Sequence, residues 1–338
     1  MAKNSTSYRT LLDALQRREY APIYYLMGEE PFYIDKISDY IENYALKEDE
    51  KTFNQTIFYG KDANIGTIIN AAKQFPMGAS HQVIIVKEAQ QLKNIDELQF
   101  YLKQPLPTTL LVFCHKNGKL DRRTKVAGEI EKKGVLFVSD KIYDDQVPKW
   151  IIDYLAEKKV TIAAKAAEML SEFLGNDLSR IANELEKLII TKPSNVASIT
   201  PELVEKNIGI SKDFNNFELV KALTNNDILK SNRIIRYFST NERANPVSVT
   251  LVVLFNFFSN LLVYHALPDK NNEIVAKALS INAYFVKDYA QASRRFPSTK
   301  TEQIISLIRN YDAQSKGVNS PSAESGELLK ELIYKILH

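Results

Sequence analysis

The residues Gly28, Glu29, Glu30 and Pro31 follow an apolar run at 23–27, in the frame in which P-loop proteins hold phosphate. A working loop has the pattern G-x-x-x-x-G-K-[ST], whose amides and lysine surround the phosphates and whose hydroxyl binds magnesium. Only Gly28 of that pattern is present. Glu29 and Glu30 would complement the positive end of a helix dipole and repel a triphosphate. The turn is predicted to be a degenerate phosphate loop, although an ordinary strand-to-helix connection has the same spacing.

A second position bears on ATPase chemistry. The apolar run at 83–86 could end in an acidic pair that holds magnesium and orients water, but the chain continues with Lys87 and Glu88. A lysine in the metal-holding place indicates that ATPase activity is lost, if this strand is the equivalent one. A solvated strand end would have the same residues.

The segment Phe75, Pro76, Met77 and Gly78 lies between an expected helix and a strong apolar run, where a polar loop is the usual connection. Two large apolar side chains bracket a proline, which stiffens the turn. If exposed, they would be good anchors for a pocket on a partner, because a few such anchors carry most interface energy. The alternative is that both side chains fold back onto their own core.

No enzyme constellation or metal-ligand spacing emerges, so no catalytic residue, metal or cofactor is predicted. Small basic clusters occur, of which Arg294 and Arg295 are the candidate DNA-facing pair. Lys+Arg 44 against Asp+Glu 41 gives a net charge of +3, far from a strongly basic nucleic-acid binder. The single cysteine, Cys114, lies in an apolar run and suits a reducing cytoplasm.

The elements that must position these residues follow from the apolar patterns. Strands at 23–27, 54–59, 81–86, 110–114 and 135–138 alternate with helical segments, which predicts a parallel α/β sheet with helices on both faces. No convincing strand follows. Helices are expected at 147–158, 163–174 and 178–190, and from Thr200-Pro201 onward. The predicted domains are an α/β domain at 1–140, a small helical domain at 141–210 and a larger helical domain at 211–338.

The most apolar segment, 251–264, falls short of the ~20 apolar residues that span a bilayer. Asn256, Ser259 and Asn260 share one helical face. The segment is predicted to be a mostly buried helix in a bundle, with no membrane contact.

The whole pattern resembles the delta subunit of the bacterial DNA polymerase III clamp loader. The resembling runs occur in family order through nearly the whole chain: YYLMGEEPF (24–32), FPM (75–77) just before QVIIV (82–86), GNDL (175–178), NELEKL (183–188), NFELV (216–220), NP (245–246), RRF (294–296), and Asp312 with Lys316 and Gly317. Each run is weak alone, and the ordered set is fairly specific.

The resemblance implies an AAA+-like, P-loop NTPase-type domain without ATPase activity, a lid-like helical domain and a C-terminal helical collar. It implies a non-catalytic subunit that binds the sliding clamp (beta) and holds the ring open at one interface for loading onto primed DNA. The gamma/tau and delta prime subunits are the implied partners through the collar. Polymerase activity belongs to the assembly, and the expected location is the cytoplasm, at replication sites on the nucleoid.

The clamp-contacting pair of the family falls at residues 75–78 of this sequence. Gly78 stands where a second bulky residue is often found, so Met77 is the better candidate contact and Phe75 is either core or wedge. Two alternatives remain open: a divergent P-loop-like NTPase, which would bind ATP, and a free-standing DNA-binding protein, whose affinity would fall steeply with salt.

Overall fold

The computed structural model describes residues 7–193, 196–209, 211–318 and 325–338. Five apolar runs of the N-terminal part pair as a sheet in the order β2-β3-β4-β1-β5, and every pairing is parallel. The strands are β1 (Ile23–Gly28), β2 (Gln55–Tyr59), β3 (Gln82–Lys87), β4 (Thr109–Lys116) and β5 (Val135–Ser139). The predicted parallel sheet is thus confirmed, because near-continuous apolar runs are what a sheet buried on both faces requires.

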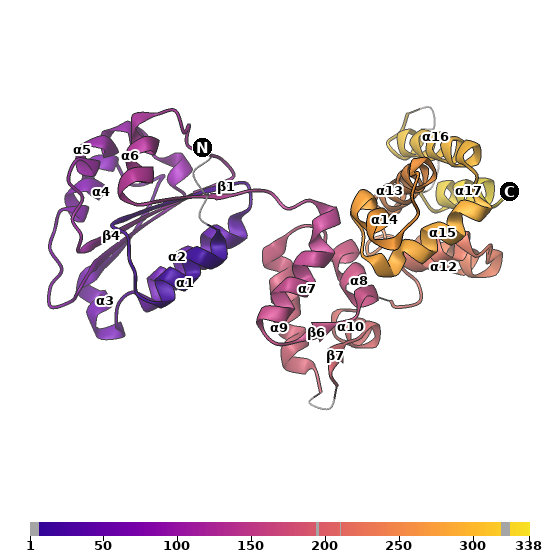
Figure 1. Cartoon of the computed structure of the whole chain (residues 1–338), viewed down its shortest axis with the longest axis horizontal. Helices are drawn as coiled ribbons and strands as arrows, with labels where there is room; N and C mark the ends of the chain where they lie inside the picture. Colours follow the sequence, from indigo (N-terminus) through magenta and orange to yellow (C-terminus); the bar gives the residue numbers. More distant parts are fainter. Residues whose placement is uncertain (1–6, 194–195, 210, 319–324) are drawn as a thin grey trace. The chain divides into compact units, whose positions relative to one another are not determined.

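Helices cover both faces of this sheet (Figure 1). They are α1 (Tyr8–Gln16), α2 (Pro31–Tyr44), α3 (Glu48–Asn54), α4 (Ile65–Ala72), α5 (Leu98–Leu102) and α6 (Lys125–Lys133), with short 3₁₀ turns at Ala89–Gln91 and Ile95–Glu97. Apolar residues of α1 and α2 pack with one set of alternate strand residues, and those of α4, α5 and α6 pack with the other set. The sequence did not predict α3, which is a charged helix without an apolar stripe.

The two candidate loops lie at opposite ends of the strands, one after the carboxyl end of β1 and the other before the amino end of β3. The turn at Gly28 ends β1, and Gly28 is the register partner of Lys116 at the end of β4. The loop at 75–78 precedes β3, and Asn54 precedes β2, the neighbour of β3. Because adjacent parallel strands begin at the same edge, the segments that enter β2 and β3 lie side by side.

The chain divides into two compact units, Met1–Ile142 and Tyr143–His338. The second unit contains a 3₁₀ turn at Asp144–Gln146, another at Ala283–Phe285, and the helices α7 (Val147–Glu157), α8 (Ala164–Leu174), α9 (Leu178–Thr191), α10 (Pro201–Ile208), α11 (Asn216–Thr224), α12 (Ile228–Thr240), α13 (Val247–Ala266), α14 (Asn272–Leu279), α15 (Val286–Arg295), α16 (Ser298–Ser315) and α17 (Ser325–Leu337). The predicted boundary at 210/211 inside this unit stays a prediction.

One expectation for the second unit was wrong in detail. Two short parallel strands, β6 (Thr161–Ile162) and β7 (Ser198–Ile199), pair within the helical part. Two residues are too few for an alternating pattern to be recognised in a sequence.

The prediction that the apolar helix is mostly buried was also wrong. Helix α13 is strongly apolar, but only 39% of its most apolar 18-residue stretch is buried. Its length and composition would suffice to cross a membrane, yet Leu254, Phe258 and Leu261 pack in the helical core, as in a soluble protein. On the other side Val252, Phe255 and Val263 are exposed, because only one face of the helix meets the bundle.

Candidate functional site

The turn after β1 is closed by backbone contacts with the end of β5. Gly28 has φ +143°, and a Cβ atom built on it would lie 1.9 Å from the Ser139 carbonyl oxygen. The same oxygen accepts hydrogen bonds from the backbone N–H groups of Glu29 (2.9 Å) and Glu30 (3.4 Å). In a phosphate loop such amides point at the ligand. Here they are already bonded to the chain, and only glycine fits this close approach.

The start of α2 carries its own anion. Glu30 is the N-cap residue, is only 7% exposed, and its carboxylate accepts a hydrogen bond of 2.9 Å from the N–H of Phe32. Pro31 occupies the first turn, where its missing N–H costs nothing. The carboxylate therefore lies where a phosphate would bind, and it would repel one.

The end of β3 holds a cation instead of a carboxylate. Lys87 Nζ lies 2.9 Å from Glu42 Oε2 on α2. Burial lowers the pKa of Lys87, but the hydrogen bond and charge of Glu42 outweigh burial, so the pKa is raised on balance. A lysine held in this way cannot coordinate magnesium, and the following residue, Glu88, has left-handed backbone (φ 56°).

The loop between α4 and β3 presents apolar side chains to solvent. Phe75 is 73% exposed and Met77 is 70% exposed, while Pro76 between them is half-buried. Gly78 follows with φ +69° and open space around its Cβ position. The alternative in which Phe75 and Met77 fold back onto the core is therefore wrong. Two neighbouring large apolar side chains on a loop are a feature of binding surfaces.

The backbone of this exposed loop is fixed by one buried side chain. Asn54, the last residue of α3, is 2% exposed. Its Oδ1 accepts a hydrogen bond from the Met77 N–H (2.6 Å), and its Nδ2 donates to the Met77 carbonyl (3.0 Å) and to the Glu50 carbonyl (2.9 Å). The sequence placed Asn54 at the start of a strand and missed this role, because a contact between residues 54 and 77 leaves no local pattern.

The two arginines of the basic pair have different surroundings. Arg294 is exposed at the end of α15. Arg295 is half-buried, donates from Nη2 to the Leu337 carbonyl (3.2 Å), and lies over the Phe296 ring at 5.2 Å. Burial lowers its pKa. The guanidinium of Arg295 thus binds the end of α17, so Arg294 is the better candidate for a DNA contact.

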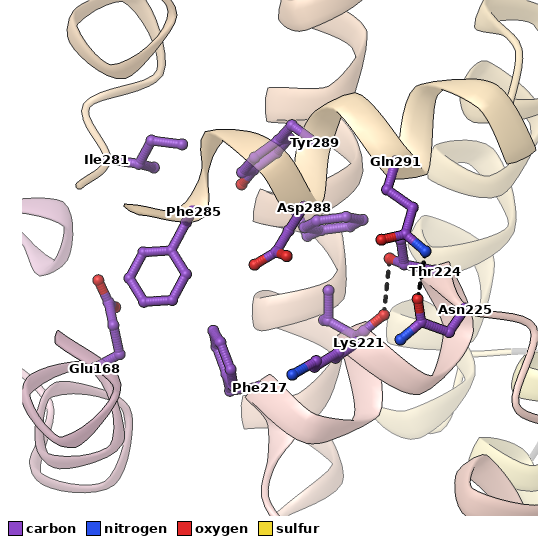
Figure 2. Close-up of a pocket in the computed structure, with 12 residues that line it drawn as sticks. Glu168, Phe217, Lys221, Thr224, Asn225, Ile281, Phe285, Asp288, Tyr289 and Gln291 are labelled. Carbon is purple, nitrogen blue, oxygen red and sulfur yellow. Dashed lines mark hydrogen bonds between the residues drawn. The ribbon is translucent and has the colours of Figure 1, made fainter. Parts of the chain in front are cut away.

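A cavity of about 150 Å³, which no sequence pattern indicates, lies among the helices of the second unit (Figure 2). Helices α8, α11, α13 and α15 contribute to its lining, which consists of Glu168, Phe217, Val220, Lys221, Thr224, Asn225, Phe257, Ile281, Phe285, Asp288, Tyr289 and Gln291. The rings of Phe217 and Phe285 meet edge to face, with centroids 5.2 Å apart.

The cavity also holds an unusual carboxyl group. Burial and the charge of Glu172 raise the pKa of Glu168 to about 7. Burial also raises the pKa of Asp288, although Lys287 and Lys221 oppose it. In the described part of the chain no cluster of three or more His, Cys, Asp or Glu residues could hold a metal ion.

Comparison with known proteins identifies relatives for this arrangement. Residues 24–139, which run from β1 to the end of β5, match the family model "DNA polymerase III, delta subunit". The DNA polymerase III subunit delta of Bacillus subtilis (strain 168) is 24% identical over 315 residues, covering 90% of each chain.

A solved structure shows the same fold. The Bacillus subtilis DNA clamp loader delta protein (YqeN) is 21% identical, with a TM-score of 0.54 over 98% of this chain and 99% of that one. The Thermotoga maritima RuvB Holliday junction branch migration motor matches more distantly, at 13% identity and a TM-score of 0.33 over 85% of each chain. The predicted fold class, a parallel-sheet α/β domain followed by a helical part, is confirmed. The family match and the curated relative confirm the predicted resemblance as well, and the chain is similar to DNA polymerase III delta subunits.

Proposed function

We propose that this chain is the non-catalytic subunit that binds the sliding clamp and holds its ring open for loading onto primed DNA. The observation that carries the proposal is the loop at 75–78, where Phe75 and Met77 are exposed although the backbone of the loop is fixed at Met77. Apolar side chains on a pre-formed loop bind a pocket at low cost in conformational entropy. Pro76 and Gly78 complete the proposed contact segment.

The proposed mechanism needs no covalent chemistry. If the loop binds the opened clamp more tightly than the closed one, that difference in affinity shifts the ring toward the open state. The closed turn at Gly28, Glu29 and Glu30 supports this mechanism, because a subunit that does not use ATP itself must act through differential binding.

The experiment is clamp binding by the full chain. Wild type and a Phe75→Ala, Met77→Ala double variant are compared for affinity toward the sliding clamp of the same organism. Loss of two central anchors should weaken binding about 100-fold or more. Since both side chains are exposed, the melting temperature should not change, and this serves as the folding control. Unchanged affinity in the double variant would contradict the proposed contact site.

The NTPase alternative is tested in the same preparation. It requires ATP binding by the isolated chain at micromolar concentrations. We expect none, because the amides of Glu29 and Glu30 are bonded to Ser139 and the helix start carries a carboxylate. The DNA-binding alternative requires affinity for DNA by the chain alone, with a steep dependence on salt.

The C-terminal helices are the proposed contact with the other clamp-loader subunits, gamma/tau and delta prime. The exposed apolar face of α13 supports this, because Val252, Phe255 and Val263 lie at helical spacing with one side to solvent. A charged substitution there, Val252→Asp, should prevent co-purification of the assembly while clamp binding by the free chain persists. The relationship to a replication clamp loader implies a cytoplasmic protein. Association with the nucleoid and contact of Arg294 with DNA are part of the proposal.

A further inference from the structure

The side chain of Asn54 is the feature on which the exposed loop depends. Buried polar groups need hydrogen-bond partners, and this amide satisfies both of its ends with backbone groups. Two of its three bonds go to the same residue, Met77, whose N–H and carbonyl are bonded at 2.6 Å and 3.0 Å. The third bond, to the Glu50 carbonyl, ties the amide to its own helix. The amide plane is thus fixed from three sides.

Within residues 75–78 the hydrogen bonds to Asn54 are the ones that the structure shows. Between the end of α4 at Ala72 and the start of β3 at Gln82 there is no regular secondary structure. Bonding both backbone groups of Met77 to one amide fixes the backbone of that residue and with it the direction of its Cα–Cβ bond, and the side chain is 70% exposed. Gly78 then lets the chain turn at once, through its positive φ of +69°.

We propose that Asn54 is a positioning residue for clamp binding, which acts by holding the Met77 backbone in the orientation that presents Phe75 and Met77 to the clamp. The inference rests on the proposed function. A loop that is already ordered does not lose its conformational freedom on binding, whereas a free loop must be ordered by the partner at the expense of affinity.

The test combines amide hydrogen exchange with clamp affinity, both measured on the full chain. Asn54→Ala removes all three bonds. We expect the Met77 amide to exchange about tenfold faster or more. Clamp affinity should fall about tenfold to thirtyfold, a loss comparable to the net free energy of the two hydrogen bonds between Asn54 and Met77. Asn54→Asp keeps an acceptor for the Met77 N–H but loses both donated bonds, so its affinity should lie between the other two.

Asn43→Ala is the matched control. Asn43 donates from Nδ2 to the Asp39 carbonyl four residues before it, as Asn54 does to Glu50, but this bond stays within α2. Its removal should leave both the Met77 amide and clamp affinity unchanged. If Asn54→Ala raises amide exchange throughout the first unit, the chain has lost its fold. The test is then the clamp affinity of Asn54→Asp, and a wild-type affinity of that variant would refute the positioning role.

The outcomes separate the two proposals. Full clamp affinity in a Met77→Ala variant would refute the contact site itself. Weak binding by Met77→Ala, together with wild-type affinity in an Asn54 variant whose Met77 amide exchanges freely, would refute the positioning role alone. Weak binding by Met77→Ala and by Asn54→Ala, with the amide of residue 77 exchanging faster only in Asn54→Ala, is the expected result.

Discussion

Two loops at opposite ends of the strands of one sheet differ in which of their groups are bonded within the chain and which are exposed. At Gly28, Glu29 and Glu30 the backbone amides bond to Ser139 and a carboxylate caps α2, so nothing remains to bind a ligand phosphate. At Met77 the backbone is also bonded, but the side chains of Met77 and of nearby Phe75 are exposed to solvent. Both loops are held by hydrogen bonds to their backbone, and the difference lies in which groups are left without a partner. The unused groups are apolar, which indicates binding to a protein surface rather than to a nucleotide.

The largest effect on stability is expected from a substitution that forces the turn at Gly28 away from β5. Gly28→Ala places a methyl group 1.9 Å from the Ser139 oxygen at a φ of +143°, so the turn must separate from β5. We expect a loss of about 3–5 kcal/mol in the free energy of unfolding, measured by urea denaturation. Gly128→Ala on α6, where an added Cβ meets nothing within 4 Å, is the control and should be neutral or stabilising. Equal stability of the two variants would contradict the closed turn.

The exposed loop should give the reverse result, with a change in binding and none in stability. Met77→Ala alone should weaken clamp affinity about 30-fold, as for a central anchor of about 2 kcal/mol. Phe75→Ala tests the neighbouring ring, whose 73% exposure now makes it a wedge candidate rather than a core residue. Calorimetric melting of both variants should coincide with wild type. A drop in melting temperature of several degrees would mean that these side chains serve the fold.

A smaller effect is expected at the cap of α2. Glu30→Ala removes the acceptor for the Phe32 N–H, and loss of an N-cap costs about 0.5–2 kcal/mol in the free energy of unfolding. The same variant is also tested for ATP binding. Even without the carboxylate, the amides of Glu29 and Glu30 remain bonded to Ser139, so ATP should still not bind. Binding of ATP by this variant would show that repulsion by Glu30 alone had closed the site.

The sequence predicted the sheet well because its strands are long apolar runs. That the turn at Gly28 is a degenerate phosphate loop stays a prediction, which rests on the glycine and lysine residues that the sequence lacks there. The sequence could not predict α3, whose residues 48–54 are mostly charged and which is held by end contacts such as the Lys47 N–H to Glu50 Oε2 bond of 2.9 Å. Nor could it find Asn54, because the contact with Met77 depends on the pairing of β2 with β3. The cavity combines Phe217 with Phe285, a contact created only by tertiary packing.

The smallest effect on stability is expected at Glu168. Its carboxyl group differs from the capping carboxylate of Glu30 in that its pKa is raised. Burial and Glu172 raise its pKa from an ordinary 4.5 to about 7. Since the folded state holds the proton more tightly than the unfolded chain, the stability contributed by the protonated carboxyl is complete below about pH 4.5 and is lost as the pH rises through about 7. Glu168→Gln, which stays neutral, should therefore be more stable than wild type at pH 8 and no more stable at pH 4.5.

The gain at pH 8 should be about 1 kcal/mol in the free energy of unfolding rather than the larger value of a fully buried carboxyl, because the side chain is half-buried and water screens its charge. Urea titrations at the two pH values measure it, with Glu242→Gln, an exposed carboxyl outside the cavity lining, as the control. A gain that is independent of pH would mean that glutamine stabilises the cavity by packing or hydrogen bonding. A loss at pH 8 would mean that the ionised carboxylate of Glu168 has a favourable partner, as the carboxylate of Glu30 has in the Phe32 N–H. The two acidic side chains would then be alike, and the closed turn would not be distinguished by having its charge satisfied.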